Sequence, residues 1–299
     1  MDKYVLDQAE GLRRLLTRSG SRVVAVVGGP TGIGCTSAVV NLAAALAAHG
    51  KDVLVIDEQQ PAGSVSELTH VQDSGAFAAV MSGRRTLTES ITRTSLGFSL
   101  ISAPRDERIS HDAAQCRALL DGAADIVLID AQLDRNGALS SLGAQAHDFL
   151  MVTRVAASAI TEAYACMKRL HYAHAIGQFR VLINHVQDPA DAAIAFENLS
   201  GVASRYLAVS LVQAGYVSED ARVARAKELS RCAVDAFPAT AAARDYRRIA
   251  AELLFWPMRP APYVRGEAQD QNDARYSVGE SDESSRAAAH YALPFPAMH

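Results

Sequence analysis

A glycine-rich segment, residues 28–37, brings together residue types that can bind a phosphate group. It reads Gly-Gly-Pro-Thr-Gly-Ile-Gly-Cys-Thr-Ser, follows an apolar run and precedes a segment of helical period. Glycines let backbone N–H groups turn toward phosphate oxygens, and a following helix adds free N–H donors and the positive end of its dipole. The segment therefore predicts a phosphate-binding loop. The residues expected to contact a nucleotide there are Gly29, Gly32, Gly34, Cys35, Thr36 and Ser37.

The loop lacks the cations of the motif that it matches. Its spacing fits G-x-x-x-x-G-K-[ST] except at the lysine, where Cys35 stands. In the deviant form x-K-G-G-x-G-K-[ST], a second lysine precedes the glycines, and the chain has Pro30 there. Because phosphoryl transfer depends on such charges, we expect weakened binding of ATP or ADP and little or no hydrolysis. A strand-to-helix turn without a ligand is the alternative.

Two aspartates directly follow apolar runs and could serve the same site. Asp130 comes after residues 126–129 and fits a carboxylate that holds Mg²⁺ through water, with the Thr36 hydroxyl as the other group on the metal side. Asp57 comes after residues 53–56 and could contact magnesium or a loop hydroxyl, or cap the segment that follows. Both interpretations of Asp57 stay open.

The elements that would position these residues follow an alternating pattern. Short runs rich in Val, Ile and Leu alternate with longer segments of helical period, which predicts an α/β fold with a doubly wound, mostly parallel sheet. Ligands then bind at the carboxyl ends of the strands. The expected strands are residues 22–27, 53–56, 98–101, 126–129, 149–152 and 179–183, with one or two more in 207–217. Late helices are expected over residues 191–205, 219–228 and 240–255.

Composition narrows the class of protein. The 299 residues are 49% hydrophobic and 21% charged, with a formal net charge of -4. A chain without a basic run does not favour direct binding to nucleic acid. The N-terminus lacks the apolar segment of a signal peptide, and no apolar stretch approaches the roughly 20 residues of a membrane-spanning helix. We expect a cytoplasmic protein whose four cysteines are free thiols.

Three segments of the chain match motifs of one known family. The first is D-Q-A-x-x-L-R, formed by Asp7, Gln8, Ala9, Leu12 and Arg13. The others are residues 147–164, similar to D-x-x-x-V-T…A-I-T-D-A-Y, and residues 181–186, similar to a V-N-R-V strand end. With these segments the chain resembles the flagellar-number regulators of the FlhG and FleN family, a branch of the MinD/ParA-like P-loop proteins. The likeness extends over residues 7–255, so it does not rest on one short motif.

The resemblance implies a function that composition does not reveal. Family members act with an FlhF-type GTPase to set the number and placement of flagella, and some restrain a flagellar transcription activator. The first segment would contact that GTPase, and Asn184 would bind adenine. The family also implies a homodimer and peripheral contact with the inner face of the cell membrane as open options. The expected parts are a partner-binding helix over 1–20, a MinD/ParA-like P-loop domain over 21–256 and a disordered tail over 257–299.

The chain departs from the family where hydrolysis needs chemistry. Relatives have D-x-D-x-G after the second strand and D-x-P-x-G after the fourth, but this chain has Gln59 at the second acidic position and lacks the proline and glycine after Asp130. A regulator with a degenerate ATP site is therefore expected. An active MinD/ParA-like ATPase that dimerises on ATP is the alternative. An ATP-dependent amide ligase and a DNA-partition protein fit less well, because the lysine and a basic surface are missing.

Overall fold

One eight-stranded sheet, in the order β3-β4-β2-β5-β1-β6-β7-β8, forms the centre of the fold. A computed structural model describes residues 20–29, 32–59, 63–71, 76–104 and 111–259. The strands are β1 (Arg22–Gly28), β2 (Val53–Asp57), β3 (Thr92–Arg93), β4 (Ser99–Ser102), β5 (Ile126–Asp130), β6 (Asp148–Arg154), β7 (Gln178–Val186) and β8 (Ser210–Ser218). Every neighbouring pair is parallel except β3–β4. The expected doubly wound, mostly parallel sheet is confirmed.

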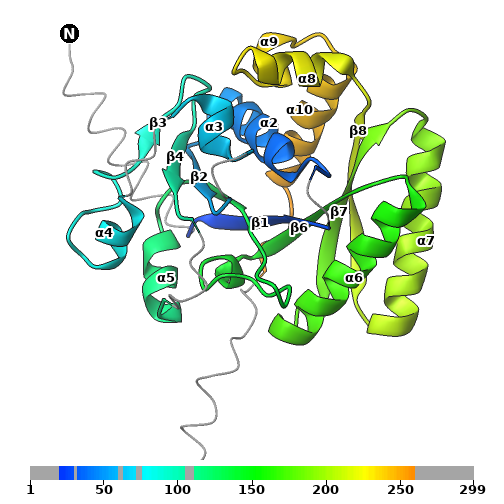
Figure 1. Cartoon of the computed structure of the whole chain (residues 1–299), viewed down its shortest axis with the longest axis horizontal. Helices are drawn as coiled ribbons and strands as arrows, with labels where there is room; N and C mark the ends of the chain where they lie inside the picture. Colours follow the sequence, from blue (N-terminus) through cyan, green and yellow to red (C-terminus); the bar gives the residue numbers. More distant parts are fainter. Residues whose placement is uncertain (1–19, 30–31, 60–62, 72–75, 105–110, 260–299) are drawn as a thin grey trace, which may run out of the picture. The chain divides into compact units, whose positions relative to one another are not determined.

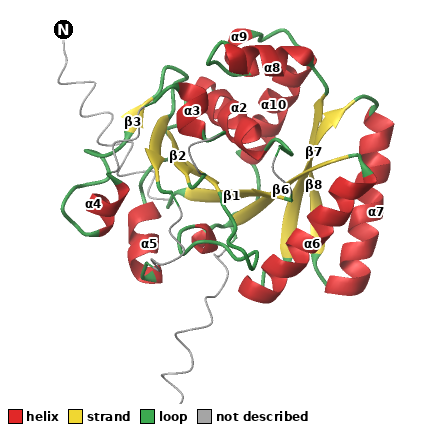
Figure 2. Cartoon of the chain, in the orientation of Figure 1, coloured by secondary structure: helices red, strands yellow, loops and turns green. Residues whose placement is uncertain are grey.

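Helices cover both faces of this sheet (Figures 1 and 2). They are α2 (Cys35–Ala48), α3 (Val65–Thr69), α4 (Phe77–Met81), α5 (Ala113–Leu120), η1 (Gly143–Gln145), α6 (Ala157–His174), α7 (Pro189–Leu207), α8 (Ala221–Glu228), α9 (Ala233–Ala236) and α10 (Ala241–Leu253). In β1, Val24 and Val26 join the core beneath α2 and α10, whereas Val23 and Val27 join the core beneath α6 and α7. Both faces of the strand are buried, which explains its continuous apolar sequence.

The late elements agree with the sequence pattern, with small differences at their ends. A single strand, β8, occupies the region expected to hold one or two. Helix α8 begins at Ala221 rather than at residue 219, because the side chain of Asp220 caps it by accepting a hydrogen bond from the Arg222 N–H. In the part of the chain that the structure describes, no helix is long and apolar enough to cross a membrane.

The apolar stripe of α10 packs into the protein core. Tyr246, Ile249, Ala250 and Leu253 are all buried, and α10 contacts α2 and β8. The apolar stripe is thus covered by packing within the protein.

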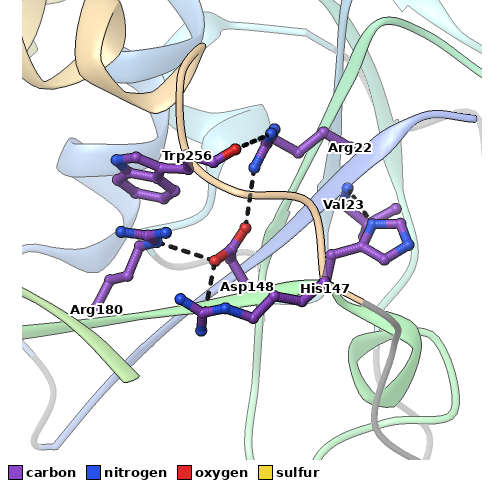
Figure 3. Close-up of polar contacts among 7 residues, drawn as sticks. Arg22, Val23, His147, Asp148, Arg180 and Trp256 are labelled. Carbon is purple, nitrogen blue, oxygen red and sulfur yellow. Dashed lines mark hydrogen bonds and ion pairs between the residues drawn. The ribbon is translucent and has the colours of Figure 1, made fainter. Parts of the chain in front are cut away.

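A buried ionic network fixes the chain after α10 at the amino end of the sheet (Figure 3). Asp148 is fully buried and accepts from Nη1 of Arg22 at 3.2 Å and from Nε of Arg180 at 2.9 Å. Arg22 also donates through Nη2 to the carbonyl of Trp256 at 2.5 Å, and the Arg180 guanidinium lies 4.0 Å from the Trp256 ring centre. A buried charge without a partner is costly, so the loss of one of these charged groups would destabilise the others.

Candidate functional site

The glycine-rich loop joins β1 to α2 at the carboxyl end of the sheet, as the sequence predicts. Gly32 and Gly34 have φ values of 87° and 107°, which disfavour residues with a side chain. A Cβ at Gly34 would lie 2.2 Å from Nδ2 of Asn184, and one at Gly28 would lie 2.4 Å from Sγ of Cys35. The backbone turn and the close packing around it therefore both require glycine.

The first turn of α2 is open to an anion. Gly34 is the N-cap residue and supplies no side-chain hydrogen bond, and the first turn holds no acidic residue. Cys35, Thr36 and Ser37 form this turn, so their N–H groups belong to those that an α-helix leaves without intrahelical acceptors. Free N–H donors and the positive end of the dipole fit a phosphate group.

Cys35 supplies no charge at the lysine position. Its side chain is partly buried against the core beneath α2. Burial raises the pKa of the thiol far above its ordinary value, with the charge of Asp130 acting in the same direction. The thiol therefore stays protonated at neutral pH and serves as a small apolar group. Cys35, Cys116, Cys166 and Cys232 are all free, as expected.

Asp130 offers a buried oxygen that fits a cation. Its Oδ1 accepts from Nε2 of Gln59 at 3.4 Å, whereas its Oδ2 is buried without a hydrogen-bond partner among the described residues. Burial raises the pKa of Asp130 to about 7, against a lowering effect of hydrogen bonding from Thr36. These features fit Asp130 and Thr36 as groups that would hold the magnesium ion of a bound nucleotide. A magnesium ion would supply positive charge for the phosphate oxygens.

Asp57 lies beside Asp130 in the β2–β5 register but is held by the chain itself. One carboxylate oxygen accepts from the N–H of Ser66 at 2.9 Å and from its hydroxyl at 3.0 Å. The other accepts from the N–H of Gln59 at 3.2 Å. Asp57 thus stabilises the start of α3, and its contact with a nucleotide or magnesium stays a prediction.

The segment after β5 is linked by hydrogen bonds to the end of β2. Nε2 of Gln59 donates to the carbonyl of Ala131 at 3.1 Å, and the N–H of Gln132 donates to Oε2 of Glu58 at 3.2 Å. The hydroxyl of Ser140 donates to Oε1 of Glu58. The residue Glu58 is only 1% exposed. Sequence reasoning missed Glu58, because an acidic residue after a strand gives no sign of burial.

Asn184 at the end of β7 contacts the loop directly. Its Nδ2 donates to the carbonyl of Ile33 at 3.1 Å, and its Oδ1 accepts from the N–H of His185 at 3.0 Å. The structure therefore brings Asn184 to the site, while its contact with adenine stays a prediction. The partner-binding residues Asp7, Gln8, Ala9, Leu12 and Arg13 lie outside the described residues.

A cavity of about 110 Å³ lies between the loop and the ends of β6, β7 and β8. Its lining includes Gly32, Gly34, Ser37, Arg154, Asn184 and Asp220. Arg154 contributes to this lining from the end of β6. The loop, the strand ends and the cavity together form a site suited to a small anionic ligand.

Comparisons with known proteins agree with this geometry. A family model described as the CobQ/CobB/MinD/ParA nucleotide binding domain matches residues 24–230. The antiactivator FleN of Pseudomonas aeruginosa is 28% identical over 249 residues, covering 81% of this chain and 89% of FleN.

Solved structures show the same fold at low sequence identity. The septum site-determining protein MinD of Pyrococcus horikoshii, complexed with Mg-ADP, aligns with a TM-score of 0.58 at 19% identity, covering 78% of this chain and 96% of MinD. Cobyrinic acid a,c-diamide synthase of Mycobacterium smegmatis, with bound ADP and magnesium, aligns with a TM-score of 0.58 at 21% identity, covering 82% and 99%. Proteins of different activity thus share this fold.

Proposed function

Because the chain belongs to the CobQ/CobB/MinD/ParA nucleotide-binding family and is of the FlhG/FleN type within it, we propose that it regulates flagellar number, placement and gene expression through protein partners. The name of the Pseudomonas relative, an antiactivator, supports a regulatory role. The partners proposed are an FlhF-type GTPase and a flagellar transcription activator, and a homodimer and peripheral contact with the membrane belong to the same proposal.

One observation carries the regulatory part of the proposal. The backbone of a phosphate-binding loop is retained, including the left-handed conformation of Gly34, but the lysine position holds a neutral, partly buried cysteine. Backbone N–H groups bind an anion without a lysine, whereas stabilising the charge that develops in phosphoryl transfer needs fixed cations. The protein therefore binds ATP or ADP with weakened affinity and hydrolyses ATP little or not at all.

In this mechanism the chain's own groups hold the ligand rather than transform it. The N–H groups at the start of α2 bind phosphate oxygens, and Thr36 and Asp130 hold magnesium. Gln59 stands where a relative has a second carboxylate, and it donates to Asp130 and to Ala131. Its amide cannot act as a base toward water. The hydrogen bonds that Glu58 and Gln59 form with the segment after β5 hold this segment in one conformation. This favours a site that keeps its structure over one that changes conformation with the bound nucleotide.

The second candidate function is an active MinD/ParA-type ATPase cycle. One observation favours it: the buried Oδ2 of Asp130 has no hydrogen-bond partner among the described residues, which suits a working magnesium site. In that case ATP would promote dimerisation and be hydrolysed. Measurable ATP turnover that Asp130→Asn abolishes would support this second function.

The partner proposal is tested with a purified FlhF-type GTPase. We expect the full-length chain to accelerate GTP hydrolysis by that enzyme and Gln8→Ala to abolish the effect, because a glutamine amide can orient water or phosphate. Arg14→Ala, in the same segment but outside the D-Q-A-x-x-L-R residues, is the matched control and should keep the stimulation. Equal stimulation by wild type and Gln8→Ala, or none by wild type, would contradict the proposal.

A further inference from the structure

Arg154, the last residue of β6, reaches the phosphate-binding loop from the neighbouring strand. Its Nη2 donates to the carbonyl of Gly32 at 2.5 Å. In the parallel ladder Arg154 pairs with Asn184, which donates to the carbonyl of Ile33 in the same loop. Two adjacent strand ends therefore hold two consecutive carbonyls of the loop, and the guanidinium is fixed at its edge.

The guanidinium of Arg154 has hydrogen-bond donors beyond the one that contacts Gly32. Its Nε is buried and has no hydrogen-bond partner among the described residues. Within that same part of the chain, the ion pairs formed by arginines do not include Arg154. A guanidinium has five N–H donors and keeps its charge at physiological pH. Since a buried donor without an acceptor is costly, this arrangement is best satisfied by a bound anion.

The cavity next to the loop places this charge where an anion can reach it. Arg154 lines the cavity together with Gly32, Gly34 and Ser37 and is the only lysine or arginine among its described lining residues. The neighbouring His185 has its pKa lowered by burial and further by the charge of Arg154, so it stays neutral near pH 7. Arg154 is thus the cation of this cavity.

We propose that Arg154 binds the phosphate groups of a nucleoside di- or triphosphate and replaces the charge of the lysines that the loop has lost. This inference rests on the nucleotide binding proposed above. Its hydrogen bond to the Gly32 carbonyl holds the guanidinium beside the loop. A cation held in this way favours the bound ground state and the transition state alike, and such uniform binding raises affinity without raising the rate of hydrolysis.

The test is calorimetric titration of the full-length protein with ATP and ADP in the presence of magnesium, and with adenosine. Arg154→Gln should weaken ATP and ADP binding roughly tenfold to a hundredfold, the usual effect of losing a hydrogen bond to a charged group. Adenosine, which lacks phosphate, should bind to this variant as to wild type. Arg205→Gln is the matched control, because Arg205 is exposed near the C-terminal end of α7, which leads into the start of β8 and so lies at the amino end of the sheet, away from the loop.

Each remaining outcome decides between the two proposals. If wild type binds ATP and Arg154→Gln binds it equally well, the role of Arg154 is overturned and nucleotide binding stands. A parallel loss of adenosine binding would show that Arg154 shapes the nucleoside pocket, which also overturns its phosphate role. No binding by wild type would overturn both proposals. Should Arg154→Gln not melt cooperatively, Arg154→Lys replaces it and is expected to lose at least severalfold in ATP affinity, because lysine lacks the planar fork.

Discussion

Replacing Gly34 with alanine should destabilise the domain through two effects that can be separated. The residue has a φ of 107°, and left-handed backbone costs a residue with a Cβ about 1–2 kcal/mol. The new Cβ would also lie 2.2 Å from Nδ2 of Asn184, and overpacking of this kind costs about 1–3 kcal/mol. We therefore expect the free energy of unfolding to fall by about 2–5 kcal/mol.

Gly32 provides a matched control for the backbone effect. Its φ is 87°, but a Cβ there would meet no atom within 4 Å. Gly32→Ala should thus lose only about 1–2 kcal/mol. In an Asn184→Ala background the steric part of the Gly34→Ala effect should disappear, which a double-mutant cycle measures as a coupling energy.

The assay is urea unfolding followed by circular dichroism, with the slope m compared among all variants. Equal losses for the two glycine variants, or an unchanged cost of Gly34→Ala after removal of the Asn184 amide, would refute the close approach of β7 to the loop.

Further expectations concern the ionic network, the buried carboxyl and the thiols. Asp148→Asn should lower the free energy of unfolding by about 3–5 kcal/mol in urea titrations, because it leaves buried arginines without a counter-charge, whereas Glu228→Gln in an exposed pair should cost less than about 1 kcal/mol. Burial raises the pKa of Asp130 to about 7, so between about pH 4 and pH 7 the folded state keeps a proton that the unfolded state has released, and stability falls as pH rises through this window. In magnesium-free denaturation, Asp130→Asn should be more stable than wild type at pH 8 and equal to it near pH 4; the same advantage at both pH values would contradict this. Because burial raises the pKa of Cys35, a thiol reagent at pH 8 should label it slowly until urea unfolds the chain, and rapid labelling of the native protein would argue against its burial.

The fold could be predicted from the sequence because its information is local. The run before Gly28 is apolar on both strand faces, which only a strand covered by helices tolerates. The glycine at position 34 marks the start of α2 in the same way, since the turn there needs a positive φ. These features need no knowledge of distant residues.

The contacts around the loop depend on which strands become neighbours. Arg154 reaches the loop because β6 lies beside β1, and Asn184 follows because β7 lies beside β6. Similarly, Glu58 binds Gln132 and Ser140 across the β2–β5 boundary. The sequence shows each residue alone, and burial or pairing at a strand end follows only from the completed sheet. Asp57 illustrates the same limit, because capping and metal binding use the same carboxylate.

The measurement that tests the central claim most directly is calorimetric titration of wild type and Cys35→Lys with ATP and magnesium, with phosphate release followed in the same samples. Ala193→Lys, which adds the same charge on the exposed face of α7, is the control. We expect wild type to bind with a Kd in the micromolar range, on the order of -8 kcal/mol, without measurable turnover, and Cys35→Lys to bind more tightly. Turnover by wild type, or no binding by either protein, would contradict the account.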